Sequence, residues 1–291
     1  MRVTKYQYPL EKNLVKKLDL MIDRCAGNSS KKDSVLICEG AEGEGKTTFS
    51  IAVAYYIADQ TGRPFNTANV FFDVEKMIKF AQETEGQIII WDEPALQALS
   101  TDWASSAVKN LTRLLMMARK KRHFMIINMT KFYKFNEYIV VDRAIAMLHV
   151  YSRRNIQSGR FMYIKRKKLE ALWRDYRFSK RRNYGKHCSK DIRGMFPDIL
   201  NPKYKYNVLK DFNNSAYEKE KDAAIMSIGA GEVKLTPAQQ RKLFVKEFIK
   251  NKIDKGEKVD TKQLSEDFNI STRSIQMYTK EIRETKFEKT Q

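Results

Sequence analysis

Cysteines and long apolar runs are scarce in this chain of 291 residues, and each scarcity excludes a class of protein. The three cysteines, Cys25, Cys38 and Cys188, are scattered and odd in number and show no metal-binding spacing, so we expect a reduced intracellular compartment. The apolar runs, such as residues 88–91 and 144–148, are strand-sized, so we expect no membrane span. The first residues are charged and lack an apolar core. We therefore expect no signal peptide and a cytoplasmic protein, in the host cytoplasm if it is viral.

Acidic side chains are also in deficit. The 35 Asp and Glu residues face 55 Lys and Arg residues, which gives a formal net charge of +20. A balance this basic usually means a polyanionic partner, either nucleic acid or an anionic membrane face. A generally basic protein without such a partner is the alternative.

Residues 34–48 give the strongest functional signal. An apolar run, residues 34–39, leads into the turn G-A-E-G-E-G-K-T and then into a helix-like run. In this G-x-x-x-x-G-K-T pattern, backbone N–H groups cradle phosphates, Lys46 reaches the β- and γ-phosphates, and the Thr47 hydroxyl binds Mg²⁺. A glycine turn without a ligand is the alternative. The predicted ATP site comprises Gly40, Ala41, Glu42, Gly43, Glu44, Gly45, Lys46, Thr47 and Thr48, with Glu42 and Glu44 able to point to solvent.

A second apolar run, residues 88–91, ends abruptly in Asp92 and Glu93. Bulky apolar residues without alternation are typical of a strand buried on both faces of a parallel sheet. Open α/β sheets place their ligands at the carboxyl ends of such strands. We therefore expect Asp92 to hold the magnesium through water and Glu93 to polarise the attacking water. A pair of surface acids after a core strand is the alternative.

A basic segment, residues 111–122, reads as a long helix before a third apolar strand at 123–130. At the end of that strand, Asn128 or Thr130 could touch the γ-phosphate. Arg119 and Arg122 stand just before the strand, where an arginine can reach a nucleotide bound by a neighbouring subunit. Cations favoured at a helix C-terminus are an equally good explanation of these arginines.

Beyond residue 152 the composition turns strongly basic, with aromatic residues interleaved. Cations neutralise backbone phosphates, and aromatic rings can stack on exposed bases. A solvated charged face over core aromatics is the alternative. The candidate DNA-binding residues of this tract are Arg153, Arg154, Lys165, Arg166, Lys167, Lys168, Arg181 and Arg182.

The C-terminal residues read as three helices. Thr236 and Pro237 start the first, which has an apolar face of Leu243, Phe244 and Phe248. Residues 261–268 and 272–284 follow, separated by a tight turn. This spacing is typical of a helix-turn-helix, with Arg273, Gln276, Met277 and Lys280 facing out as candidate DNA contacts. A protein-docking module is the alternative.

Alternating strands and helices in the first half predict an α/β fold with a mostly parallel sheet, followed by a small all-α domain. The boundaries are residues 1–190 for the first domain with its basic extension, 191–233 for a connecting segment, and 234–291 for the helix-turn-helix.

Residues 34–152 resemble the P-loop ATPases of the HerA/FtsK type, which include viral DNA-packaging ATPases and the ATPase domain of Zot-like phage proteins. The matching stretches are residues 40–47, 88–93 and 117–130. In that family an arginine precedes the fourth core strand and a polar residue, usually glutamine, ends it. By spacing, Arg119 and Thr130 match these positions. The resemblance implies an ATP-driven ring, a pentamer or hexamer, that moves duplex DNA.

Two functions from different classes follow. The first is a Mg²⁺- and ATP-dependent DNA translocase of phage or mobile-element type. The second is an ATP-switched DNA-binding protein, such as a replication initiator, helicase loader or transposition regulator. A nucleoside or small-molecule kinase would share the phosphate loop, but it would leave the basic tract and the C-terminal helices unexplained.

Overall fold

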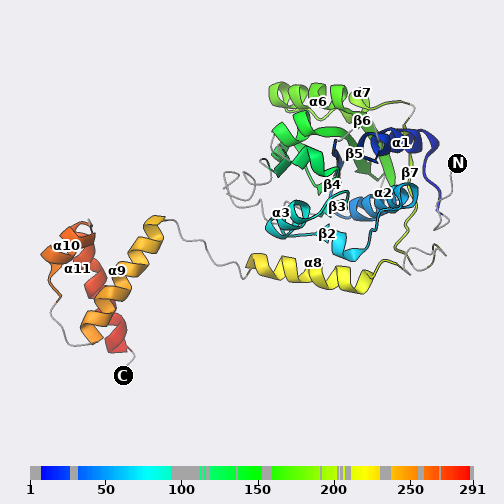
Figure 1. The fold of residues 1–291 in the computed structure, drawn as a ribbon. Helices are drawn as coiled ribbons and strands as arrows, with labels where there is room; N and C mark the ends of the chain where they lie inside the picture. Colours follow the sequence, from blue (N-terminus) through cyan, green and yellow to red (C-terminus); the bar gives the residue numbers. More distant parts are fainter. Residues whose placement is uncertain are drawn as a thin grey trace. The chain divides into compact units, whose positions relative to one another are not determined.

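The computed structural model divides the chain into two compact units, Met1–Gly229 and Ala230–Gln291 (Figure 1). The residues that it describes are 8–26, 32–92, 112, 114–115, 118–135, 137–152, 159–190, 192–201, 203, 206, 211–229, 237–254, 259–268 and 270–288.

A seven-stranded sheet forms the centre of the first unit (Figure 1). The strand order is β2-β3-β4-β1-β5-β6-β7, in which the first five strands are parallel and the last two are antiparallel to their neighbours. The α/β fold with a mostly parallel sheet is therefore confirmed. The strands are β1 (Ser34–Glu39), β2 (Val70–Phe71), β3 (Ile88–Trp91), β4 (Phe124–Met129), β5 (Ala144–Tyr151), β6 (Arg160–Lys165) and β7 (Arg193–Met195).

Helices cover both faces of this sheet because its central strands carry apolar side chains on both sides. In β1, Leu36 packs into one hydrophobic cluster and Ile37 into the other. Residues of α1 (Lys12–Ala26), α2 (Lys46–Thr61) and α8 (Asn214–Gly229) join the first cluster, and those of α3 (Val74–Glu83) and α6 (Arg166–Ser179) join the second. Shorter segments are α7 (Tyr184–His187), η1 (Thr67–Asn69), η2 (Ala118–Lys121), η3 (Phe132–Lys134) and the π-helical η4 (Tyr138–Arg143).

The parallel strands give the sheet two distinct edges. Gly40, Asp92, Thr130 and Ser152 directly follow β1, β3, β4 and β5, so they share one edge, which we call the carboxyl edge. The opposite edge, the amino edge, carries the start of β4. It also carries the end of β6, because antiparallel pairing sets Lys165 opposite the beginning of β5. Ligands of open α/β sheets bind at the carboxyl edge.

Most of the segment 191–233, which the sequence indicates only as a connecting segment, belongs to the first unit, which ends at Gly229. β7 pairs with β6, so β6 has neighbours on both sides. Phe212 and Tyr217 are buried in the cluster that α1 and α2 also join. These side chains lie far along the chain from their partners, which is why local periodicity did not reveal their burial.

The second unit consists of α9 (Pro237–Asp254), α10 (Thr261–Phe268) and α11 (Thr272–Glu288). Ile275 and Tyr278 of α11 are buried in the core of this unit. The predicted apolar face of α9 was wrong at Phe244 and Phe248, which are 61% and 37% exposed, although both rings contact Phe268. Val245 and Ile249, one helical turn apart, fill the core in their place because they face Leu264 and Ile275 in the same cluster.

Among the described residues, no helix is both long and apolar enough to cross a membrane.

Candidate functional site

The phosphate loop has the backbone shape that its glycines predict. Gly43 and Gly45 adopt left-handed φ angles of 77° and 87°, and Gly45 directly precedes the first residue of α2. Gly40 is required for a different reason. A Cβ there would lie 2.3 Å from the Val150 carbonyl oxygen of β5. The loop therefore curls tightly between β1 and the amino-terminal end of α2, where helix N–H groups favour anions.

Lys46 and Thr47 occupy the first turn of α2, with Thr48 beside them. The Lys46 ammonium group folds back across the loop, and its Nζ donates to the Ala41 carbonyl oxygen at 2.8 Å. The Thr47 hydroxyl donates to Asp92, at 2.9 Å from Oδ2 and 3.2 Å from Oδ1. The structure thus brings together Thr47 and Asp92, the two residues that the sequence assigned to the metal.

Asp92 is 3% exposed and is held by two further donors. Asn128 Nδ2, near the end of β4, donates to Oδ1 at 2.8 Å. Its own Oδ1 accepts from Ser50 of α2, so the amide is oriented from behind. The Tyr217 hydroxyl of α8 donates to Asp92 Oδ2 at 2.7 Å. Threonine, asparagine and tyrosine from three elements therefore fix one carboxylate.

Sequence reasoning named Asn128 only as an alternative to Thr130 and missed Ser50 and Tyr217. Ser50 lies one helical turn after Lys46, so helical spacing could have indicated it. Tyr217 lies 125 residues beyond Asp92 and carried no local signal. Burial, followed by the nearby Asp92 charge and the hydrogen bond to it, raises the pKa of Tyr217, so its hydroxyl keeps the hydrogen that it donates.

These oxygens fit Mg²⁺. The ion prefers hard oxygen ligands, binds through one or two carboxylates and phosphates, and retains several waters. A threonine hydroxyl and a buried carboxylate in contact, at the start of a helix below a glycine cradle, supply that donor set. Glu93, the expected water-polarising residue, lies outside the described residues.

The two acidic side chains of the loop differ. Glu42 is exposed, as expected. Glu44 is half-buried, and its Oε1 accepts a hydrogen bond from the Ser152 hydroxyl at 3.0 Å. It therefore joins the loop to the end of β5 instead of pointing freely into solvent.

Another buried carboxylate, Glu39, precedes the loop directly and is 2% exposed. Its Oε1 accepts from the Tyr184 hydroxyl at 2.8 Å, and its Oε2 lies 2.6 Å from His149 Nδ1. The His149 and Tyr184 rings stack, with centroids 3.7 Å apart. The loop is thus connected to α7, which follows the basic tract.

Arg119 and Arg122 lie at the amino edge, away from the phosphate loop. Arg122 follows η2 in a left-handed conformation (φ 56°), and its carbonyl oxygen accepts from Arg63. β4 has six residues, so it separates Arg122 from the carboxyl edge by about 20 Å. Arg122 thus cannot reach the phosphate site of its own chain. The sequence predicts a helix over 111–122. The described residues at the end of this segment form the 3₁₀ turn η2.

The basic tract follows α6 along the sheet. Lys165, Arg166, Lys167 and Lys168 are exposed at its start, and Arg181 and Arg182 are exposed beyond its end. Arg153 and Arg154 lie outside the described residues. Of the tract's aromatic side chains, Tyr163 and Trp173 are buried in the core, whereas Phe178 is 86% exposed.

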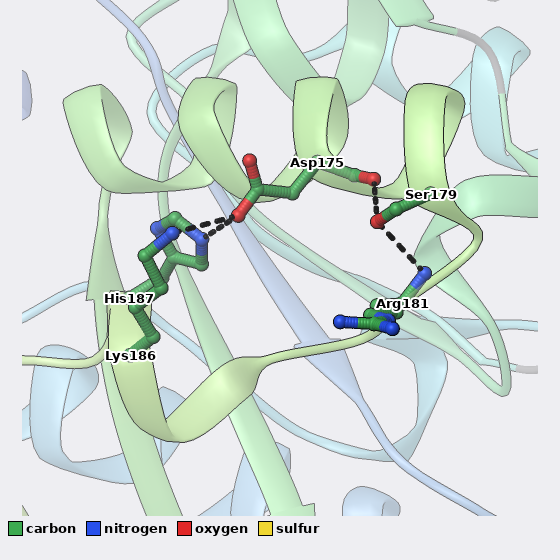
Figure 2. Close-up of polar contacts among 5 residues, drawn as sticks. All are labelled: Asp175, Ser179, Arg181, Lys186 and His187. Atoms are coloured by element: carbon green, nitrogen blue, oxygen red, sulfur yellow. Dashed lines mark hydrogen bonds and ion pairs between the residues drawn. The ribbon is translucent and has the colours of Figure 1, made fainter.

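The end of the tract is held to α6 by Asp175 (Figure 2). His187 Nε2 and Lys186 Nζ lie 2.7 and 3.4 Å from Asp175 Oδ2. The hydrogen bond from His187 lowers the pKa of Asp175. The Ser179 hydroxyl accepts from the Arg181 backbone N–H at 3.4 Å, which shapes the turn out of α6. Lys186 and His187 of α7 are thus fixed against the helix.

In the second unit, the predicted outward positions are exposed: Arg273, Gln276, Met277 and Lys280. The Ser271 hydroxyl accepts from the Ser274 backbone N–H and caps α11. These side chains form an accessible polar and basic face on that helix.

No protein-family model matches the chain, and no curated protein matches it. One similar solved structure is a KaiC-like protein from the hyperthermophilic archaeon Pyrococcus horikoshii OT3. It is 16% identical over 46% of this chain and 79% of its own, with a TM-score of 0.34. A likeness this distant supports no assignment, so the sheet topology and the loop geometry carry the interpretation.

Proposed function

We propose that the first unit binds Mg²⁺–ATP and hydrolyses it. The observation that carries this proposal is the contact between Thr47 and the buried Asp92 below the glycine loop. Lys46 holds the phosphates, Thr47 and Asp92 place the metal, and Glu93 orients the attacking water. Asn128 orients Asp92, and Thr130, directly after β4, would contact the γ-phosphate. The bound ion would supply charge neutralisation at the β- and γ-phosphate oxygens.

Exchanging Glu93 for Gln tests this assignment. The variant should bind ATP as the wild type does but lose turnover, because the amide cannot polarise water. Lys46→Ala should lose both binding and turnover. Full turnover by Glu93→Gln would remove Glu93 from this role.

We propose that the nucleotide is used on DNA, most simply duplex DNA. The support comes from α6, whose first turn carries Arg166, Lys167 and Lys168 directly after Lys165, with no acid among them. Cations at a helix N-terminus oppose the helix dipole. Violation of such a local rule is typical of functional sites. A phosphate backbone lying across this turn would offset the repulsion.

We propose further that several copies form a ring, a pentamer or hexamer, that translocates DNA in the cytoplasm, as in phage or mobile-element motors. Arg119 and Arg122 lie at the amino edge, away from the nucleotide of their own chain, so any action on phosphate would be on a neighbouring copy. Arg119→Ala or Arg122→Ala should abolish turnover when it is the only chain present. Mixing either variant with a Lys46→Ala chain should restore part of the turnover, because the arginine variant still binds nucleotide and the Lys46→Ala neighbour still supplies the arginines.

An ATP-switched DNA-binding protein, such as a replication initiator, helicase loader or transposition regulator, is the second candidate. The three-helix second unit favours it, because the exposed face of Arg273, Gln276 and Lys280 on α11 could read a DNA site as a helix-turn-helix does. Hydrolysis that rises with the length of any duplex would support the motor. Site-specific binding with little stimulation of hydrolysis would support the switch.

A further inference from the structure

The first turn of α8 is fixed to the rest of the unit. The Asn213 side chain caps the helix by accepting from the Ala216 N–H at 3.0 Å, and the Asn213 N–H donates to the Thr67 hydroxyl at 3.1 Å. The Tyr217 ring packs against Phe72 and Phe212, with centroid distances of 5.5 and 5.8 Å. Tyr217 is 2% exposed, so its hydroxyl is aimed at Asp92 by a packed ring.

The Asp92 carboxylate uses most of its acceptor capacity. It offers about four lone-pair positions. Thr47, Asn128 and Tyr217 supply one hydrogen each. About one position then remains to accept from a metal-bound water. This balance fits a carboxylate that holds Mg²⁺ through water, with its orientation set by the three donors.

We propose that Tyr217 is the positioning residue for this carboxylate, so that Mg²⁺-dependent nucleotide binding requires α8 to be seated. The inference rests on the proposed function of the site. Tyr217 does not touch the nucleotide; it acts through Asp92. Partners of metal-holding groups typically change metal affinity about 10–100-fold when they are removed. Because α8 is the last element before Ala230, seating of this helix would also connect the metal site with the chain leading to the second unit.

The test is Tyr217→Phe in the full chain, read by binding of a fluorescent ATP analogue with MgCl₂ and with EDTA. The Mg²⁺ concentration for half-maximal tight binding should rise about tenfold, because one donor to the carboxylate is lost. Binding in EDTA should be unchanged, because the phosphate loop is intact. The matched control is Tyr8→Phe, which removes another buried hydroxyl, 2.6 Å from the Ala52 carbonyl oxygen. It should leave both values unchanged.

Asn213→Ala separates positioning from direct contact. This residue does not touch Asp92, but its loss removes the cap of α8 and should raise the Mg²⁺ requirement in the same direction, by a smaller factor. An unchanged Mg²⁺ requirement in Tyr217→Phe would overturn the inference, and so would a lower one, because the hydroxyl would then compete with the metal. Equal weakening in MgCl₂ and EDTA would also overturn it, since that pattern marks general damage. If the wild type itself bound no nucleotide, the proposed function would fail instead.

Discussion

At the scale of single residues, the site depends on positions where only one residue type fits. Gly40 is the clearest case, since the Val150 carbonyl oxygen of β5 occupies the place of any side chain. Gly40 N–H also donates to the Met129 carbonyl oxygen of β4 at 3.2 Å. The start of the phosphate loop is therefore fixed between the strands on both sides of β1.

Gly40→Ala should destabilise the protein and weaken nucleotide binding. The added methyl must push β5 or the loop aside, which costs about 1–3 kcal/mol in a packed core. Urea unfolding and nucleotide titration measure the two effects. Gly185→Ala is the control because a Cβ there meets nothing within 4 Å and its φ is not left-handed. A Gly40→Ala protein as stable as that control would contradict this account of the loop.

At the scale of elements, α6 is unusual in carrying cations at both ends. Its first turn has Arg166, Lys167 and Lys168 and no acid. Helices normally place acidic residues there, because the dipole favours them. The helix would therefore be more stable in isolation with fewer cations at this turn. We interpret this loss of helix stability as a consequence of binding phosphates.

Replacing Arg166 and Lys167 by Glu should move stability and DNA binding in opposite directions. Stability should rise by a few tenths of a kcal/mol, because acids complement the helix dipole. DNA affinity and the slope of its salt dependence should both fall. Thermal unfolding and fluorescence anisotropy measure these changes. The double replacement Lys12→Glu and Lys16→Glu, at two exposed positions of α1, is the control for net charge, because it changes the charge by the same amount. Equal loss of affinity in that control would indicate a general charge effect.

A second element-scale prediction concerns His123, which joins α3, β3 and β4. Its Nδ1 accepts from the Gln87 N–H, and its Nε2 donates to the Ala81 carbonyl oxygen. Burial lowers the pKa of His123 below its ordinary value of 6.5. The unfolded chain thus takes up a proton at a higher pH than the folded protein. The contribution of neutral, buried His123 to the stability of the folded protein is therefore complete above about pH 6.5. It is lost as the pH falls toward and through the pKa of His123 in the folded protein.

Urea unfolding of the wild type and His123→Gln at pH 7.5, 6.5 and 5.5 measures this effect. The wild type should be the more stable protein at pH 7.5, and its advantage should shrink as the pH falls. An advantage that stayed constant over this range would show that His123 does not titrate differently in the two states.

At the scale of the whole molecule, the boundary between the units falls at Gly229, after α8. The helix that touches Asp92 belongs to the first unit, although it begins at Asn214, well beyond residue 190, where the sequence places the end of the basic extension. The three-helix unit has its own small core of Val245, Ile249, Leu264, Ile275 and Tyr278.

A chain that ends at Gly229 should therefore keep Mg²⁺-dependent nucleotide binding unchanged, because it retains Tyr217 and the whole sheet. A chain that ends at Asn213 should need a higher Mg²⁺ concentration for tight nucleotide binding, since Asp92 loses the Tyr217 donor and Phe72 loses its contact with the Tyr217 ring. Nucleotide titration, with circular dichroism as the folding control, compares the two. Loss of binding in the longer chain would place part of the site in the second unit.

Residue spacing and apolar runs were enough to predict the features that depend on residues close together in the sequence. The glycine loop, Lys46, Thr47 and Asp92 follow from spacing and from the carboxyl ends of buried strands, and the sheet is as expected. Tyr217 and β7 could not be predicted, because their roles depend on contacts far along the chain. Phe244 was predicted to lie on the apolar face of its helix because it is apolar, whereas the neighbouring Val245 is the residue that is buried in the core.

Steady-state ATP hydrolysis by the purified full chain, with and without non-specific duplex DNA, tests the central claim most directly. Lys46→Ala serves as the blank. The account predicts Mg²⁺-dependent hydrolysis that Lys46→Ala abolishes and that duplex DNA of any sequence stimulates, more strongly as its length increases. Hydrolysis equal to that of the blank under all conditions would contradict the account. Slow hydrolysis that DNA does not change would contradict the DNA translocase and favour the ATP-switched DNA-binding protein.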